Sequence, residues 1–516
     1  MLHTNHVCQL LPFTNDNNNK SALISQYSHE TEDIYCKITG ESYYNYYKEI
    51  SRLIIAVVNS EDVMPVSGKT TTKNMTSGSI VMQIISFSLP LMFGNIFQML
   101  YNTVDSIVVG NFVGKEALAA VGSTTMIINM LVFFFNGFSI GAGVVISRFF
   151  GSKEHSRLHT AIETTMSVTF IFCVVLTILG TLGVKPMLRF MATPADVFSD
   201  ASTYLTIYFL GFSGLLIYNM GSGILRAVGD TLRPLYFLIL TSLMNIVLDL
   251  LFVVVIHMGI EGVAYATIIS QAVSAVLILV LLIRADDIYK LSWKDLCLDI
   301  ETIKMIVTVG LPAGIQSVIT AFSNVFVQSY INYFGSSCMA GWSSYNKLDS
   351  FIMLPMQSMA MAATTFVSQN IGAGKKKRAD QGTVTAILMA VATTGLIALL
   401  LFIFARPAIR LFSSDESVIA YGSLFIHTNV FFLLFNCVNH TLAGALRGRG
   451  DARAPMIIML ASFVAIRQVY LFVVTRFIDN TPLLVGFGYP VGWVCCCVFE
   501  VAYFMIKYKK PVNSPE

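Results

Sequence analysis

Two aspartates stand inside stretches of the chain that are otherwise apolar enough to lie in lipid. Asp105 is one, and Asp249 is the other, four residues after Asn245, so the Asn245 and Asp249 side chains share one helix face. A charged side chain in hydrocarbon is costly, and each such residue is by default a candidate for function. Two nearby carboxylates at low dielectric cannot both stay charged, so they would share a proton or take up a metal ion. The chemistry indicated is the binding and release of a cation.

The predicted depth of these residues in a bilayer supports a common site. At a rise of 1.5 Å per residue from the ends of the predicted helices, Asp105 and Asp249 lie about 8 Å, and Thr267 about 9 Å, below the same surface. We therefore predict that Asp105, Asn245, Asp249 and Thr267 form an oxygen-lined site for a proton or Na⁺. The alternative is a buried structural network in which Asp249 caps polar groups of the next helix.

The composition requires that the helices carrying these residues lie in a membrane. Hydrophobic residues make up 55% of the 516 residues and charged residues only 12%, and the mean hydropathy is +0.68. The net charge of +3 gives no reason to expect a nucleic-acid partner. Apolar runs long enough to span a bilayer occur at 80–110, 121–147, 161–183, 200–221, 234–256, 260–283, 303–332, 340–370, 384–405, 418–441, 455–476 and 483–507. We predict an all-α integral membrane protein with twelve transmembrane helices.

The lysines and arginines between these runs predict the orientation. With both termini in the cytoplasm, most of them fall in inner loops, and only Lys115, Lys185, Arg189, Arg406, Arg410 and Arg476 fall outside. We interpret the KKKR cluster at 375–378 as a topology anchor that touches anionic lipid headgroups. The predicted location is the bacterial inner membrane.

The chain repeats itself at a shift of about 221 residues. LRAVGDTLRP at 225–234 returns as LRGRGDARAP at 446–455, and ISRFFGSKE at 146–154 returns as VSQNIGAGK at 367–375. Six helices separate equivalent points, so the halves are parallel repeats related by an axis along the membrane normal. We predict two pseudo-symmetric six-helix bundles, an N-lobe at 75–290 and a C-lobe at 291–516, preceded by a polar extension at 1–74 that is expected to be disordered.

The repeat also provides an internal control for the cation site. Equivalent positions in the second half hold Val327, Ile466, Tyr470 and Gly488 in place of Asp105, Asn245, Asp249 and Thr267. The symmetry of the fold therefore does not demand these polar groups, which favours a role specific to the first half.

Several further polar or helix-bending residues are weaker candidates for cavity or gating roles. Proline within a span permits a bend, and an acid or base within a span suggests contact with a substrate or ion, although structural pairing is the alternative. These candidates are Pro90, Asn102, Gln316, Lys347 and Asp349.

Taken together, the motifs resemble the multidrug and toxic compound extrusion (MATE) transporters, especially the bacterial DinF-like branch. The resemblance rests on LPLMFGNIFQMLYNTVDSIVVGNFVG at 89–114, ALAAVG at 117–122, the two LR..GD repeats and FVSQNIGAGKKKR at 366–378, and covers about residues 76 to 508. It implies antiport of H⁺ or Na⁺ against organic cations and amphipathic drugs, by a monomer that needs no cofactor. It also implies that Asp105, Asn245, Asp249 and Thr267 form the N-lobe cation site. The NorM branch of the family has acids where Gln316 and Asn436 stand here, so a second sodium site of that type is not expected.

Three rival functions remain to be weighed. A lipid-linked oligosaccharide flippase of the same superfamily would use a basic cavity and commonly more helices, and we expect a nearly base-free interior. A membrane enzyme is not expected, because the chain carries no HExxH, GxSxG or nucleotide-binding loop. A passive channel would differ from an antiporter in showing no counterflow against an ion gradient.

Overall fold

A computed structural model describes residues 72–285 and 287–508, so most of the predicted N-terminal extension lies outside the described residues. All described residues belong to one compact unit. Its first half consists of α3 (Ile80–Val108), η1 (Val109–Val113), α4 (Lys115–Ser152), α5 (His155–Phe190), α6 (Ala195–Ala227), α7 (Leu232–Asp249), η2 (Leu250–Val255) and α8 (Ile260–Arg284).

The second half repeats this order with more interruptions. It consists of α9 (Ile300–Asn332), α10 (Ser336–Gly372), α11 (Lys376–Ile403), α12 (Ala405–Arg410), α13 (Glu416–Asn429), η3 (Val430–Phe432), α14 (Leu433–Gly448), α15 (Arg453–Leu460), η4 (Ala461–Ile466), α16 (Arg467–Val473), η5 (Val474–Ile478), α17 (Pro482–Gly486) and α18 (Gly488–Tyr508). No strand occurs in the part of the chain that the structure describes.

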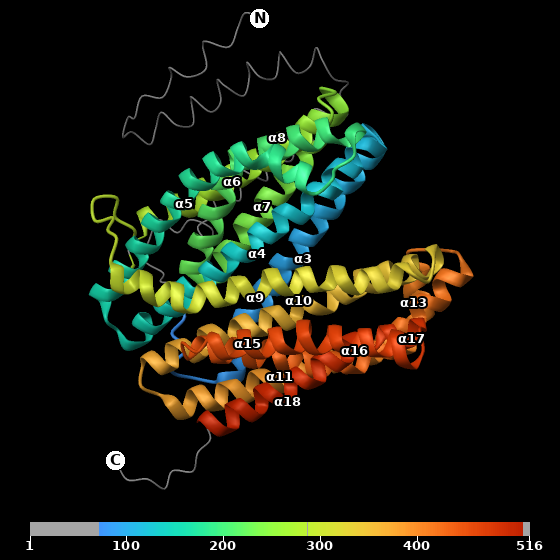
Figure 1. Cartoon of the computed structure of the whole chain (residues 1–516). Helices are drawn as coiled ribbons and strands as arrows, with labels where there is room; N and C mark the ends of the chain where they lie inside the picture. Colours follow the sequence, from blue (N-terminus) through green and yellow to red (C-terminus); the bar gives the residue numbers. More distant parts are fainter. Residues whose placement is uncertain (1–71, 286, 509–516) are drawn as a thin grey trace, which may run out of the picture. The chain divides into compact units, whose positions relative to one another are not determined.

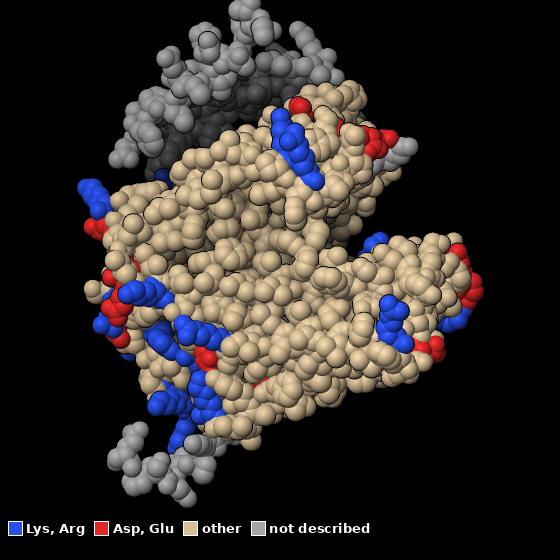
Figure 2. Space-filling view, in the orientation of Figure 1, with Lys and Arg blue, Asp and Glu red and all other residues tan. Residues whose placement is uncertain are grey.

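Twelve helical stretches among the described residues are long and apolar enough to cross a membrane, which confirms the predicted number. Many run well past the predicted limits: the second, predicted at 121–147, spans Glu116–Ser152. About 20 apolar residues cross the hydrocarbon, and the remaining turns extend beyond the apolar window on which the prediction relied. Large apolar side chains cover the outside, as Phe190 at 93% and Leu182 at 73% exposure illustrate. Figure 2 shows charged side chains mainly at the two ends of the helices, with an uncharged surface between them.

The helices form the two predicted bundles (Figure 1). In the first half α6 packs against α4, α5 and α8, and α7 packs against α3 and α8; in the second half α10 packs against α11, α13 and α14. The halves meet mainly where α4 contacts α9 and α10, and where α3 contacts α10. The fold is therefore an all-α membrane protein of two six-helix bundles.

Glycines allow the halves to touch at backbone distance. A Cβ on Gly151 of α4 would lie 2.0 Å from the carbonyl oxygen of Gln369, and a Cβ on Gly372 of α10 would lie 2.0 Å from that of Arg148. Gly151 and Gly372 are equivalent in the sequence repeat. No other residue fits at this crossing, because any side chain would overlap the opposite backbone.

Hydrogen bonds surround this glycine crossing, and we call this region the closed end of the molecule. Ser368 Oγ donates to the carbonyl of Val144 at 2.7 Å, Gln369 Nε2 donates to that of Ala227 at 2.9 Å, and an Arg148 guanidinium nitrogen donates to that of Arg449 at 2.9 Å. At the opposite end the surface is hollowed between the helices of the two halves (Figure 2). These hydrogen bonds therefore hold the two halves together at this end.

The basic cluster at 375–378 has an additional role that the sequence did not indicate. Lys375 Nζ donates to the carbonyl of Thr76 at 2.8 Å, and Arg378 donates to the carbonyls of Met75 and Ser77 and to Gln83 Oε1. These two side chains fix the segment before α3 instead of reaching outward. Lys376 and Lys377 are exposed, as a headgroup anchor requires.

Candidate cation site and central cavity

Asp105 and Asp249 come together as predicted. Asp105 lies near the end of α3, and Asp249 is the last residue of α7 and is fully buried. The two carboxyl groups lie within electrostatic range of each other. Two carboxylates so placed at low dielectric cannot both stay ionised without a cation, so they would share a proton or hold a metal ion. The pair can therefore release a proton and take up another cation in its place, although its role stays a prediction.

Asn245 supplies an amide beside the acids. Its side chain is 2% exposed, and no described residue hydrogen-bonds to its Nδ2 or Oδ1 or to either carboxylate oxygen of Asp249. Buried polar atoms without partners are rare, and they commonly mark a place for water, an ion or catalytic chemistry. Thr267, at 9% exposure, lines the same cavity as Asn245. Asn245 and Thr267 therefore face one cavity, and Asn245 shares a helix face with Asp249.

Both acid-bearing helices change their winding next to the site. α7 ends at Asp249 and continues as the π-helical segment η2, and α3 continues as the π-helical segment η1 after Val108. Wider π turns are rare and occur often at functional sites. Sequence reasoning missed them, because a π segment such as Leu250–Val255 is as apolar as an α-helical one.

Three tyrosines near the acids were also missed. Tyr204 and Tyr208 of α6 and Tyr101 of α3 lie within electrostatic range of Asp105, and Gln271 Nε2 donates to the Tyr208 hydroxyl at 3.5 Å. The spacing of four residues between Tyr204 and Tyr208 places both on one face. That signal could have been used, but aromatic pairs at helical spacing are usual packing material.

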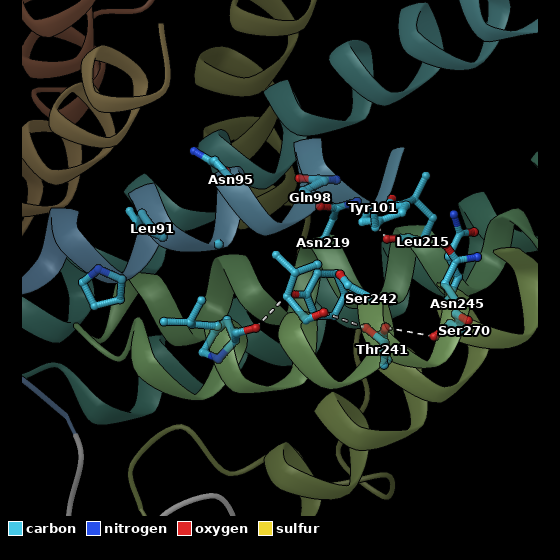
Figure 3. Close-up of a pocket in the computed structure, with 18 of the residues that line it drawn as sticks. Leu91, Asn95, Gln98, Tyr101, Leu215, Asn219, Thr241, Ser242, Asn245 and Ser270 are labelled. Atoms are coloured by element: carbon cyan, nitrogen blue, oxygen red, sulfur yellow. Dashed lines mark hydrogen bonds between the residues drawn. The ribbon is translucent and has the colours of Figure 1, made fainter. Parts of the chain in front are cut away.

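A small cavity runs through the first half beside this site, and we call it the first-half cavity. Its volume is about 100 Å³, and it extends from Asn245 and Thr267 to Pro90 and Arg226. Figure 3 shows polar side chains of α3, α6, α7 and α8 facing one another across it, among them Gln98, Asn219, Ser242, Asn245 and Ser270. The predicted cation site thus lies beside a polar cavity inside one bundle.

A larger cavity of about 450 Å³ lies between the two halves, and we call it the central cavity. Polar residues of the first half, such as Asn95 and Asn136, and of the second half, such as Gln316 and Asn324, line it together. Its size suits a small organic molecule.

The expectation of a nearly base-free interior is wrong. Arg226, His440 and Arg447 line the central cavity. The two arginines were assigned to loops because the apolar runs end before them, but α6 continues to Ala227 and α14 to Gly448. Both arginines therefore lie in the last helical turn. One of the two arguments against a flippase is removed, and the count of twelve spans remains.

The other predicted residues lie in different places. Pro90 lines the first-half cavity, and Gln316 lines the central cavity with its amide against the Met459 sulfur. Asn102 is exposed. Lys347 and Asp349 are not among the residues that line either cavity; the Lys347 ammonium lies 5.4 Å from the centre of the Phe412 ring.

The MatE family model matches the chain twice, over residues 90–251 and 312–473. The chain belongs to the MatE family. The double match agrees with the internal repeat, and it confirms the resemblance to MATE transporters. The chain is therefore a multi-pass membrane transporter, not an enzyme, from a family that exports small organic substrates.

Named MatE relatives match most of the chain. The probable multidrug resistance protein YoeA of Bacillus subtilis (strain 168) is 27% identical over 450 residues, which cover 85% of this chain and 96% of the relative. A protein of Shewanella oneidensis named FAD transporter is 24% identical, over 68% of this chain and 78% of the relative. A solved structure titled as the outward-facing conformation of a multidrug resistance MATE family transporter matches with a TM-score of 0.81 at 22% identity, covering 86% of this chain and 99% of that one. This structural likeness supports the fold.

Proposed function

We propose that this MatE protein is a secondary antiporter that exports small organic solutes in exchange for H⁺ or Na⁺. The observation that carries the proposal is the pairing of half-buried Asp105 with fully buried Asp249, with the unpartnered Asn245 amide beside them. Loading and unloading of a cation there would change the charge within α3 and α7. A cation that binds one conformation more tightly than another shifts the population toward it.

The arrangement of the two halves supports alternating access. The central cavity lies between the halves, and the closed end seals one side of the molecule. The closed end carries the basic cluster at 375–378, so the positive-inside rule makes it the cytoplasmic end of an inner-membrane protein. In this state solute would leave outward, and both termini would be cytoplasmic.

The substrate class follows from the relatives only in outline. YoeA and other relatives carry the description of multidrug resistance proteins, which supports export of organic cations and amphipathic drugs. A monomer that needs no cofactor is a further part of the proposal. The Shewanella relative carries the name FAD transporter, so an organic anion is a second candidate.

Transport by purified protein in liposomes tests the proposal. We would follow rhodamine 123, a cationic xanthene dye, and fluorescein, an anionic one, under separate proton and sodium gradients. We expect an imposed gradient to drive transport of at least one dye by the wild type. Asp105→Asn or Asp249→Asn should abolish the dependence of transport on the gradient. Asp349→Asn, in an acid of the second half, should retain it. Gradient-driven transport that survives in both first-half variants would remove the proposed site.

A further inference from the structure

We propose that the central cavity binds its solute through an anionic group, a phosphate or a carboxylate, held between Arg226 and Arg447. This inference rests on the proposed export function and narrows its substrate class to organic anions and to zwitterions that carry an acidic group. It replaces the expectation of simple organic cations.

The two arginines occupy equivalent positions of the internal repeat. Arg226 is the arginine of LRAVGD in the last turn of α6, and Arg447 is that of LRGRGD in the last turn of α14. Both side chains are half-buried, and both line the central cavity. Each half therefore presents one guanidinium to the same space.

No acidic residue balances these charges within the cavity. The described residues that line it include amides, hydroxyls, apolar side chains and His440, but no Asp or Glu. Arg447 interacts electrostatically with Glu500 of α18, but the two residues form no ion pair. Glu500 is fully buried and does not line the cavity. Charge in the cavity is thus positive.

The other half-buried or buried arginines have partners. Arg233 donates to the Tyr289 hydroxyl at 2.6 Å, Arg449 pairs with Asp380, and Arg467 donates to Ser323 and Asn324. Arg226 and Arg447 make no hydrogen bond or ion pair with any described residue. A basic residue in the last turn also complements the helix dipole. That effect does not explain why two such residues face one cavity whose lining contains no acid.

The remaining lining suits the body of an organic anion. Guanidinium groups bind phosphate and carboxylate through two parallel hydrogen bonds. Phe133, Met361 and Phe463 offer apolar and aromatic contact, and Gln316 and Asn324 offer further hydrogen bonds. A cationic solute would be repelled by the guanidinium groups of Arg226 and Arg447, and it would also displace the water that solvates them. Binding of a cation in this cavity is therefore disfavoured.

Arg226 also connects the solute to the coupling site. It lines both the central cavity and the first-half cavity, which extends to Asn245 and Thr267. An anion at Arg226 and a cation at Asp105 and Asp249 would therefore act on one continuous polar wall.

Binding of matched probes to the purified full chain tests the assignment. Flavin mononucleotide and riboflavin differ by one phosphate, whereas fluorescein and rhodamine 123 share a xanthene body but differ in the sign of their charge. We expect fluorescence polarisation to show at least tenfold tighter binding of the anion in one pair or both. Preference in the flavin pair alone identifies a phosphate, and preference in the xanthene pair alone identifies a carboxylate. Equal or weaker binding of both anions overturns the proposal.

Variants locate the binding. Arg226→Gln and Arg447→Gln should each weaken binding of the preferred anion by about 10- to 100-fold, as loss of hydrogen bonds to a charged group predicts. Binding of neutral riboflavin should stay unchanged, and binding of cationic rhodamine 123 should stay unchanged or become tighter. Arg453→Gln, in an exposed arginine at the start of α15, should bind like the wild type. Arg226→Lys and Arg447→Lys keep the charge but lose the planar guanidinium, so their affinity for the anion should lie between those of the wild type and the Gln variants. If a Gln variant fails to fold, the corresponding Lys variant takes its place. Unchanged anion affinity in folded Gln and Lys variants overturns the assignment.

Transport separates this inference from the proposed function. Gradient-driven export of rhodamine 123 with no anion binding would overturn the anion site and leave the antiporter standing. Tight anion binding that depends on both arginines, without any gradient-driven export, would support the anion site and overturn the antiporter.

Discussion

Unpartnered polar atoms at Asn245 imply that this residue costs stability. A buried amide without hydrogen bonds costs about 1–3 kcal/mol, and an apolar group of similar shape removes that cost. We therefore expect Asn245→Leu to raise the thermal unfolding midpoint in detergent and to abolish ion-coupled transport, a trade of function for stability.

Asn370 provides the matched control for Asn245. Its amide donates to the carbonyls of Met75 and Phe366 at 3.2 and 2.8 Å, and its exposure is also close to zero. Asn370→Leu should lower the midpoint. If Asn245→Leu lowers it by a similar amount, the amide is part of a satisfied structural network.

Asp451 fixes the C-terminal helix to the second repeat motif. Its Oδ2 accepts hydrogen bonds from Tyr503 and Lys507, both at 2.7 Å. Partial burial alone would raise the pKa of Asp451, but these hydrogen bonds outweigh it and lower the pKa below the ordinary value. A lowered pKa in the folded state stabilises the protein above the unfolded pKa of about 3.9, and this contribution is lost as the pH falls through the folded pKa.

We expect Asp451→Asn to lower the free energy of unfolding at pH 7 by about 1 kcal/mol. The expected loss is no larger because Lys507 is exposed and solvent screens its charge. The difference from the wild type should shrink as the pH falls below about 4. Unfolding midpoints measured in detergent between pH 7 and 3.5 would show this, with Asp479→Asn, in an exposed loop acid, as control. A constant difference across that range would contradict the assigned role.

At the residue scale, the sequence predicted what charge and spacing determine. Asp105, Asn245 and Asp249 could be grouped because helix geometry fixes faces and depths. Arg226 and Arg447 could not, because their place depends on where α6 and α14 end. Whether a basic side chain near a helix end turns inward is decided by packing between the halves, which a single sequence does not reveal.

At the scale of elements, the crossing of α4 and α10 makes a sharp prediction. A methyl group at Gly151 would overlap the Gln369 carbonyl, so Gly151→Ala must push the two backbones apart. Overpacking of this kind costs about 1–3 kcal/mol. We expect a lower unfolding midpoint and slower transport, measured in detergent and in liposomes.

Gly122, on the same helix α4, is the control for Gly151. No atom outside its own local helix lies within 4 Å of the Cβ position there. Gly122→Ala should therefore behave like the wild type or be slightly more stable. Equal effects of the two substitutions would mean that the crossing is not tight.

The elements themselves were largely predictable. Runs of apolar residues identified all twelve spans because only hydrophobicity and length are needed. The breaks within spans were not predictable. The 3-10 segment η3 and the π segment η4 consist mainly of the same apolar residue types as their neighbours, so the sequence pattern does not change where the winding does.

For the whole molecule, the proposal requires the closed end to open during each cycle. Val144 and Ser368 lie on opposite halves and are joined by a hydrogen bond of 2.7 Å. A disulfide between Val144→Cys and Ser368→Cys should stop transport after oxidation, and a reducing agent should restore it. Each single variant should be insensitive to oxidation. Transport that continues at full rate with the cross-link complete would exclude opening at this end.

The uneven placement of charged groups over two matching halves has a consequence for energy conversion. Both halves contribute an arginine to the central cavity, but only the first half carries the pair Asp105 and Asp249. A variant without Asp105 and Asp249 would keep the central cavity and the contacts between the halves but would lose its coupling to an ion gradient. Such a protein would be a downhill facilitator, equilibrating solute across the bilayer without accumulating it on either side.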